Sequence, residues 1–268
     1  MYPRPNHAPL WAITPLRREQ LKRLNAPGAN AEATLAAELY LEEGCDSLVD
    51  LGCWLGVLGL KLKQLLNPKR LYLLDALPLY LFIAQMLFTE QEALADVTFQ
   101  EMYVLPDDAH QPRYFTVDFG NSIRTSTSLK LSYDSTRVLA LIPVGETVTT
   151  AEAIVKLREL CGAAGYLKID IDGVDYALVN ELLQTDFRPK VLHFEGLKHN
   201  PDFEYQLFET LESLRRAGYL VPTTELIFEE SRDMVCLMTS KNGWRLLSYK
   251  KNAELIMTFD HVLTSRTP

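Results

Sequence analysis

The sequence has few of the features that mark metal centres, disulfide scaffolds or membrane anchors. The N-terminus lacks the apolar segment of a signal peptide. The one run that approaches membrane length, residues 71–88, is interrupted by Asp75 and Pro78. Four cysteines are scattered with no Cys-x-x-Cys pair, which argues against a zinc site or a disulfide framework: Cys45, Cys53, Cys161 and Cys236. We therefore expect a cytoplasmic protein that does not contact a membrane.

Positive charge is also scarce. The 268 residues carry a formal net charge of -8, so the surface as a whole would repel the phosphates of a nucleic acid. With 47% hydrophobic and 23% charged residues, the chain has the composition of an ordinary globular protein with one substantial core. The expected partner is therefore a small-molecule substrate. Leucines near the N-terminus (Leu21, Leu24 and those within 35–41) could cover an active-site mouth or pair two subunits as a homodimer.

The order of predicted elements indicates an α/β fold. Residues 1–44 form a predicted helical extension, in which apolar residues recur at helical spacing over 31–43 and Gly44 is placed to end the helix. After it, short apolar strands alternate with amphipathic helices. The predicted strands are 48–51, 71–74 and 97–100, and the helices between them are 55–66 and 78–90. This alternation favours a parallel sheet with right-handed crossovers.

The alternation lapses between about residues 107 and 148, where we expect a β-hairpin insertion. Its predicted strands are 113–117, 128–132 and 138–143, with a turn at 118–122. The α/β pattern resumes with a helix over 150–161, an acidic strand, a helix after Gly173, a strand over 191–194 and a helix over 203–216. Two last strands, 219–222 and 234–238, close the sheet as an antiparallel pair. The predicted domain, 45–268, is thus a Rossmann-like sheet, mostly parallel, with an antiparallel last strand.

A glycine turn follows the first predicted strand. Residues 49–56, Val-Asp-Leu-Gly-Cys-Trp-Leu-Gly, lead from a strand into a helix, which is where open α/β sheets bind nucleotide-like ligands. A dinucleotide site would carry Gly-x-Gly-x-x-Gly, but Trp54 stands at the second glycine, and an indole is a poor neighbour for a pyrophosphate. The pattern favours a nucleoside ligand such as S-adenosylmethionine over a nicotinamide cofactor. The alternative is a tight turn that only packs the helix on the strand.

An acid ends the second predicted strand. Asp75 follows four apolar residues, at a distance from Gly52 that suits a carboxylate accepting hydrogen bonds from both hydroxyls of a ribose. The alternative role for Asp75 is to cap the helix that begins near Pro78.

Charged residues occupy a segment that otherwise resembles a buried strand, Leu167-Lys168-Ile169-Asp170-Ile171-Asp172. In a strand, the lysine and both aspartates share one face, and a buried ion without a partner costs several kcal/mol. The next strand ends in His193 and Glu195. If these strands are neighbours, all of these side chains meet at the carboxyl edge of the sheet, which is the predicted reaction site. Alternatively, His193 is a hydrogen-bonded core residue and Lys168 only neutralises an aspartate.

Taken together, these segments resemble the FkbM-type family of S-adenosylmethionine-dependent methyltransferases over about residues 46–196. Residues 49–56 are similar to the family's DxGANxG, Asp75 with Pro78 to its acid with a nearby proline, and 168–173 to its KxDxEG, followed by a strand that ends in glutamate. The segment 149–154 stands where the family has a Thr-Leu-Asp-like stretch. The sequence departs from the pattern at Trp54, where a small polar residue is usual, and at Asp172, where glutamate is usual.

The resemblance implies an enzyme that methylates an oxygen of a small metabolite, such as a sugar, a secondary-metabolite hydroxyl or a carboxylate. Its fold would be that of class I methyltransferases, and its cofactor S-adenosylmethionine. The residues expected at the cofactor are Asp50, Gly52, Cys53, Trp54, Gly56, Asp75, Ala76, Glu101, Met102 and Asp170.

Methyl transfer is an in-line displacement, so positioning dominates and an alcohol acceptor benefits from a general base. The expected catalytic residues are His199, His193, Asp170 and Asp172, with His199 preferred as the base because it lies in a loop. The residues expected at the substrate are Arg124, Glu195 and Asn200. Mg²⁺ on Asp170, Asp172, Glu195 and Asn200 is a less favoured alternative. A further alternative is a degenerate domain that serves in interaction, with the Trp54 indole filling the cofactor space.

Overall fold

A computed structural model describes residues 10–105, 114–118, 124–126, 139–143, 145–171, 174–195, 209–210, 212–219, 231–237, 245–250 and 253–258. The statements below concern these residues. Within them, every helix is too short or too polar to cross a bilayer.

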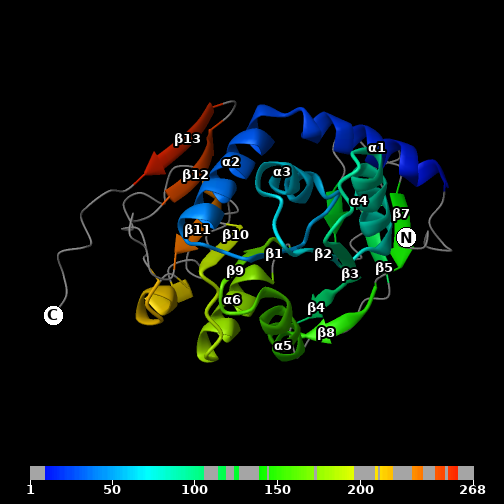
Figure 1. The fold of residues 1–268 in the computed structure, drawn as a ribbon. Helices are drawn as coiled ribbons and strands as arrows, with labels where there is room; N and C mark the ends of the chain where they lie inside the picture. The colour runs from blue at the N-terminus through cyan, green and yellow to red at the C-terminus, as the bar shows by residue number, and fades with distance from the viewer. Residues whose placement is uncertain are drawn as a thin grey trace.

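The elements follow the alternating order expected from the sequence (Figure 1). The helices are α1 (Leu10–Leu24), α2 (Pro27–Glu42), α3 (Val57–Leu66), α4 (Pro78–Glu90), α5 (Thr150–Cys161) and α6 (Asp175–Gln184). The strands of the main sheet are β1 (Ser47–Leu51), β2 (Leu71–Asp75), β3 (Val97–Glu101), β9 (Gly165–Ile169), β10 (Val191–Glu195), β11 (Ser231–Leu237), β12 (Arg245–Lys250) and β13 (Ala253–Thr258). The remaining strands are β4 (Tyr103–Leu105), β5 (Tyr114–Asp118), β6 (Arg124–Ser126), β7 (Leu139–Pro143) and β8 (Thr147–Thr149).

The main sheet confirms the predicted Rossmann-like fold. Its strand order is β3-β2-β1-β9-β10-β11-β12-β13, and β3, β2, β1, β9 and β10 are mutually parallel. Beyond β10, the strands β11, β12 and β13 pair in antiparallel fashion. The chain order reverses between β1 and β9, which is the switch point at which the carboxyl ends of open sheets bind ligands.

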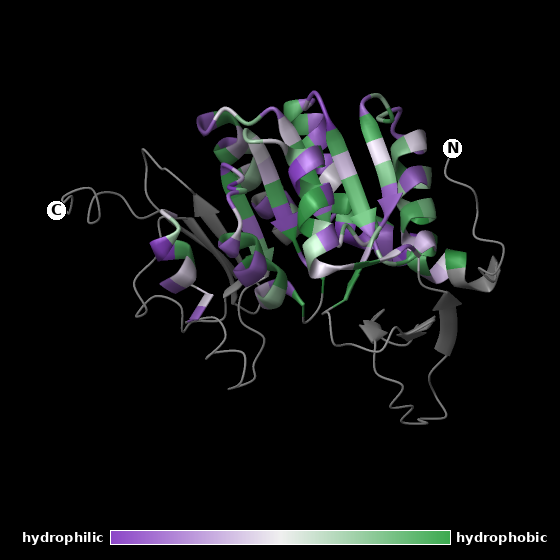
Figure 2. Ribbon diagram, turned by 90° about the horizontal axis from the view of Figure 1, so that it is seen from below, coloured by the Kyte–Doolittle hydropathy of each residue, from purple (hydrophilic) through white to green (hydrophobic). Residues whose placement is uncertain are grey.

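Different helices cover the two faces of the sheet (Figure 1). On one face, α2, α3 and α4 pack on side chains such as Leu48, Leu73 and Tyr166. On the other face, α5 and α6 pack on Leu51 and Ile169. Both faces of the central parallel strands β1 and β9 are therefore buried, as expected for a parallel sheet, whereas β3 at the edge is partly exposed. Accordingly, hydrophobic residues predominate along the central strands in Figure 2.

Helix ends are set by local signals in the sequence. Thr149 and Glu152 form a capping box at α5, in which the Thr149 hydroxyl accepts the Glu152 N–H at 3.2 Å and the Glu152 carboxylate accepts the Thr149 N–H at 2.9 Å. Pro78 opens α4, where its missing N–H costs nothing. Gly44, with φ +62°, follows the end of α2 as predicted.

The predicted insertion contains an antiparallel three-stranded sheet, β6-β5-β7. This confirms two of the three predicted strands, while β6 was not predicted and the predicted strand 128–132 lies outside the described residues. A short parallel pair, β4-β8, was also not predicted. Near the C-terminus, β11 confirms the strand expected at 234–238, β12 and β13 were not predicted, and most of 219–222 lies outside the described residues.

One predicted boundary needs correction. The acidic strand was expected to continue through Asp170 and Asp172, but β9 ends at Ile169. The Asp170 N–H still reaches the Leu51 carbonyl at 2.9 Å, after which the N–H groups of Gly52 and Cys53 turn to the Leu74 carbonyl of β2. The turn of β1 toward β2 thus removes the strand partner that residues after Asp170 would need. Asp172 lies outside the described residues.

Candidate functional site

Gly52 forms the bend at the end of β1. It has φ +82°, and a Cβ added to it would overlap the carbonyl oxygen of Asp170. The segments after β1 and β9 are therefore in direct backbone contact, which only glycine permits here. Gly56, with φ +74°, is the N-cap of α3, and a Cβ there would lie 2.7 Å from the Ala84 Cβ of α4. Both glycines of the predicted turn thus have a steric reason.

Asp75 connects the end of β2 to this turn. One of its carboxylate oxygens accepts the Trp54 N–H at 2.8 Å and the other accepts the Leu77 N–H at 2.9 Å. The second contact lies in the local turn that leads into α4, but the N-cap of that helix is Leu77, so Asp75 is not the cap that the alternative expected. Each oxygen retains a lone pair after one backbone contact, so the carboxylate can still accept ligand hydroxyls.

The Trp54 indole is engaged by two helices. Its ring lies edge-on to Tyr80 of α4 with 6.5 Å between centroids, and the Arg23 guanidinium of α1 stacks over it at 4.9 Å. It packs with an apolar cluster that includes Leu16 of α1 and Leu79 of α4. The indole is therefore packed between residues of α1 and α4.

A row of charged side chains crosses the centre of the sheet. Asp50 of β1, Lys168 of β9 and His193 of β10 are direct neighbours in the strand register. The Lys168 ammonium lies 3.7 Å from the Asp50 carboxylate and donates to the Asp170 carboxylate at 2.9 Å. Nδ1 of His193 is 3.0 Å from the Tyr166 hydroxyl. The prediction that Lys168 offsets the aspartates is confirmed.

Burial changes the acid strength of this group. Asp50 is 1% exposed, and loss of solvation raises the pKa of its carboxyl, while Lys168 acts in the opposite direction. Burial likewise raises the pKa of Asp75 to about 7, opposed by the N–H groups of Leu77 and Trp54 and reinforced by the negative charges of Asp50 and Asp170. The charges of Asp50 and Asp170 thus both disfavour ionisation of Asp75.

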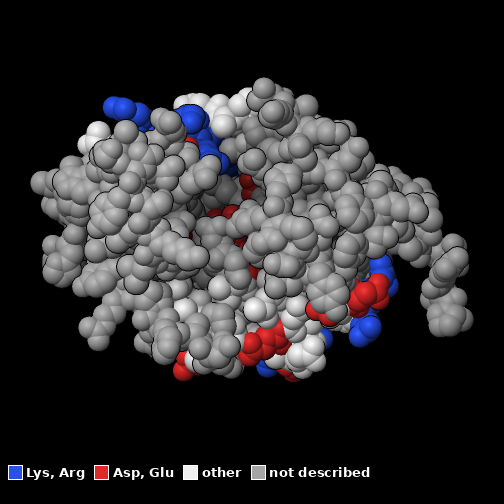
Figure 3. Space-filling view, turned by 180° about the vertical axis from the view of Figure 1, so that it is seen from behind, with Lys and Arg blue, Asp and Glu red and all other residues white. Residues whose placement is uncertain are grey.

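Several residues expected at the cofactor are neighbours at the carboxyl ends of β2 and β3. Glu101 at the end of β3 pairs with Asp75 in the register, and the Met102 N–H donates to the Asp75 carbonyl at 3.0 Å. Ala76 follows Asp75, and its carbonyl accepts the Gly145 N–H at 2.8 Å. Figure 3 shows a hollow in one face of the molecule with acidic side chains inside it.

Other expected site residues are placed in part or not at all. His193 is 1% exposed within the sheet, which agrees with its alternative role as a hydrogen-bonded core residue. Glu195 ends β10 and Arg124 begins β6, so their backbones are placed. The expected residues Asp172, His199 and Asn200 lie outside the described residues.

Some residues at the site were not expected from the sequence. Tyr166 stands two positions before Lys168, so strand alternation alone could have placed it on the same face. Gly145 lies so close to Glu101 that an added Cβ would be 2.6 Å from its carboxylate. Gln20, in α1, contacts the glycine turn, and nothing in its local sequence indicates this.

Metal ligands do not cluster in the described part of the chain, where no group of three or more histidine, cysteine, aspartate or glutamate side chains is arranged to hold an ion. The Mg²⁺ alternative rested on two residues outside that part, Asp172 and Asn200.

No family model matches the chain, and no curated protein matches its sequence. Solved structures of similar fold include precorrin-6y C5,15-methyltransferase from Geobacter metallireducens (13% identity, TM-score 0.43, covering 78% of this chain and 87% of that one). They also include a putative O-methyltransferase from Klebsiella pneumoniae (11%, 0.43, 74% and 78%) and the O-methyltransferase from Bacillus cereus in complex with SAH (13%, 0.40, 74% and 79%). At these identities and scores, the similarities do not establish what this chain binds or does.

Proposed function

We propose that this protein is an S-adenosylmethionine-dependent methyltransferase. The observation that carries the proposal is the hydrogen bond between the glycine turn and Asp75, in which the Trp54 N–H of the turn donates to the carboxylate at the end of β2. A buried acid with spare lone pairs, held against this turn, suits a nucleoside whose ribose hydroxyls need an acceptor.

The site fits this cofactor in two respects. Both carboxylate oxygens of Asp75 keep a lone pair for a ligand hydroxyl, and the buried Oδ1 of Asp50 accepts no hydrogen bond from the described residues although it faces the Lys168 ammonium. When bound, the cofactor supplies a methyl carbon that is open to in-line attack. Asp75 would hold the ribose, and Asp50 and Asp170 would face the positively charged end of the cofactor. The chain contributes chiefly position.

The finer assignment is O-methylation of a small metabolite by a member of the FkbM-type family. It is supported by Lys168 of β9, which binds Asp170 just after that strand, and by the adjacent His193 on β10. His193 is buried and bound to Tyr166, so it suits a role behind the reacting atoms. We keep His199 as the proposed general base, Asp172 as a further proposed catalytic residue, and Arg124, Glu195 and Asn200 as proposed substrate contacts. Replacing His199 with alanine should then lower turnover more than cofactor affinity.

The degenerate interaction module is the second candidate, and the contacts of Trp54 favour the methyltransferase over it. Its best support was an indole filling the cofactor space, whereas this indole packs against Arg23 and Tyr80. A nicotinamide cofactor is disfavoured by the same residue, because Trp54 replaces the glycine that would clear space for a pyrophosphate.

Calorimetry with S-adenosylmethionine, S-adenosylhomocysteine and NAD tests the proposal directly. We expect the first two to bind and NAD to fail. Asp75→Ala should weaken binding at least tenfold, since it removes both acceptors, whereas Asp186→Ala, at an exposed site of equal charge, should leave the affinity unchanged. Failure of folded wild-type protein to bind either adenosyl compound would reject the function. If the cofactor binds, a mass-shift screen of hydroxylated and carboxylated metabolites, incubated with S-adenosylmethionine, would identify the acceptor.

A further inference from the structure

The N-terminal helix α1 is bound to the glycine turn through a buried amide. Gln20 is fully buried, and its Nε2 donates to the Leu55 carbonyl at 2.5 Å and to the Ile83 carbonyl of α4 at 3.1 Å. Its Oε1 accepts from Arg17, which also pairs with Glu90 near the end of α4. Because Arg17 can only donate, the orientation of the amide is fixed, and both of its N–H groups face carbonyls.

A second contact from α1 reaches the preceding residue. Arg23 stacks over the Trp54 ring at 4.9 Å, and this tryptophan has φ +48°, a left-handed conformation that is unfavourable for a bulky side chain. The Trp54 N–H is the group that donates to Asp75. Helix α1 thus contacts residues 54 and 55 through Arg23 and Gln20, while the Asp75 carboxylate accepts the backbone N–H of residue 54.

We propose that Gln20 and Arg23 are positioning residues for the cofactor site, and that α1 fixes the backbone of the glycine turn so that the Trp54 N–H stays on Asp75. This inference rests on the proposed function for its effect on affinity. It also gives a reason for a tryptophan at this place in the turn, since its ring is the group on which Arg23 of α1 stacks.

The test compares isosteric variants with a matched control on the same helix. Gln20→Met keeps the shape and removes the donors, Arg23→Met removes the cation, and Arg23→Lys retains it. Arg18→Met changes an equal charge at an exposed position of α1. For S-adenosylhomocysteine, measured by calorimetry below the unfolding transition, we expect Gln20→Met to weaken affinity about tenfold and Arg23→Met a few-fold. Arg23→Lys should restore most of the loss, and Arg18→Met should bind as wild type does.

Two readouts separate positioning from general stability. The emission of Trp54, assigned by difference from Trp54→Phe, should shift in Arg23→Met and return in Arg23→Lys. Hydrogen exchange of a peptide covering residues 52–57 should be faster in Gln20→Met, with exchange over β9 unchanged. Equal affinities in all folded variants would overturn the inference. If wild-type protein binds no adenosyl compound, the proposed function falls, and unchanged exchange over 52–57 in Gln20→Met would overturn the inference independently.

Discussion

At Gly52, the missing side chain is a steric requirement. An added Cβ would overlap the Asp170 carbonyl oxygen, and φ is already +82°. We expect Gly52→Ala to lower the free energy of unfolding by about 3 kcal/mol or more, because backbone rather than a flexible side chain must move. Gly44→Ala is the matched control, with φ +62° and Lys190 Nζ at 3.7 Å from its Cβ, and it should cost about 1 kcal/mol. Urea denaturation measures both, and equal costs would contradict the contact.

Asp75 should make stability depend on pH. Its folded-state pKa is raised to about 7 because its carboxyl is buried near Asp50 and Asp170. Between pH about 4 and about 7, the unfolded chain has released this proton while the folded protein retains it. The unfolded state therefore binds fewer protons, and the free energy of unfolding falls as pH rises through this window.

The Asp75→Asn variant should consequently show a shallower fall. Urea midpoints measured from pH 4 to pH 8 would test this, since Asn cannot ionise and the remaining acids are common to both proteins. Parallel profiles for wild type and variant would show that Asp75 does not titrate in this range.

Single residues were predictable where local sequence encodes their task. Gly52 and Asp75 were found because a turn after a strand needs glycine and because four apolar residues precede the acid. Gln20 was not, since its partners, Leu55 and Ile83, lie 35 and 63 positions away and its helix would accept many polar residues there. Long-range contacts of this kind have no local signal.

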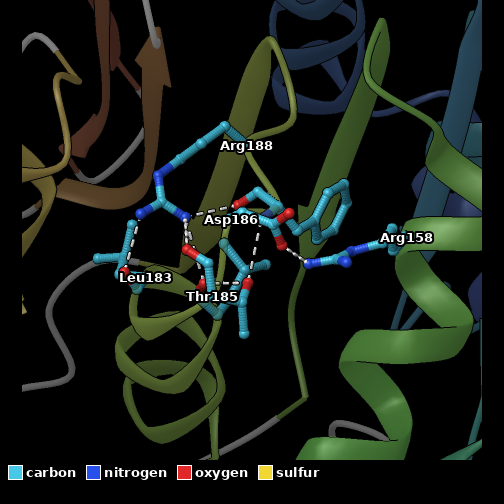
Figure 4. Close-up of polar contacts among 7 residues, drawn as sticks. Arg158, Leu183, Thr185, Asp186 and Arg188 are labelled. Carbon is cyan, nitrogen blue, oxygen red and sulfur yellow. Dashed lines mark hydrogen bonds and ion pairs between the residues drawn. The ribbon is translucent and has the colours of Figure 1, made fainter.

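At the scale of elements, the C-terminal end of α6 is held by one guanidinium (Figure 4). Nη1 of Arg188 donates to the carbonyls of Thr185 and Phe187, each at 2.7 Å, and Nη2 donates to the Leu183 carbonyl at 2.9 Å. The carbonyls of Leu183 and Thr185, at the end of α6, otherwise lack the partners that a continuing helix would supply. The same figure shows Arg158 paired with the exposed Asp186.

The two arginines in Figure 4 should differ in their contribution to stability. Arg188→Ala should cost about 1–3 kcal/mol, because charge-assisted bonds to helix-end carbonyls are lost. Arg188→Lys should recover less than half, since a single ammonium lacks the planar fork. Arg158→Ala removes a surface pair and should cost less than about 1 kcal/mol. Thermal and urea unfolding would rank the three, and a cost at Arg158 equal to that at Arg188 would argue against the capping role.

Helices and strands were predictable where a local sequence pattern determined their ends. The helix over 150–161 was placed at its observed bounds, and Thr149 with Glu152 supplies the capping box that begins it. The acidic strand was extended too far, because alternation at Asp170 continues past the point where β1 turns away. Strand ends depend on the partner strand, which a local pattern does not contain. The strand β6 was missed for a related reason, since its residues, Arg124–Ser126, are polar and pair only with β5.

At the scale of the molecule, the topology followed from the alternation of strands and helices, which allows few parallel arrangements. It brought β1, β9 and β10 side by side, and with them Asp50, Lys168 and His193. The sequence predicted that Lys168 meets an aspartate but not that it bridges two. The ion pair with Asp50 joins segments 118 positions apart, and its geometry depends on register, which only the assembled sheet defines.

This bridge leads to a prediction about the whole sheet. Lys168→Met leaves the Asp50 carboxylate buried without its cation, so we expect a loss of about 3–5 kcal/mol in the free energy of unfolding. The loss should be greater at pH 8 than at pH 5, because removing the cation raises the pKa of Asp50 further and the folded protein resists its ionisation. The double variant Asp50→Asn with Lys168→Met should regain at least half of the loss, since no buried charge is left without its partner. Lys156→Met, which removes a more exposed pair with Glu146, should cost less than about 1 kcal/mol. Additive costs in the double variant would show that Asp50 and Lys168 do not stabilise each other across β1 and β9.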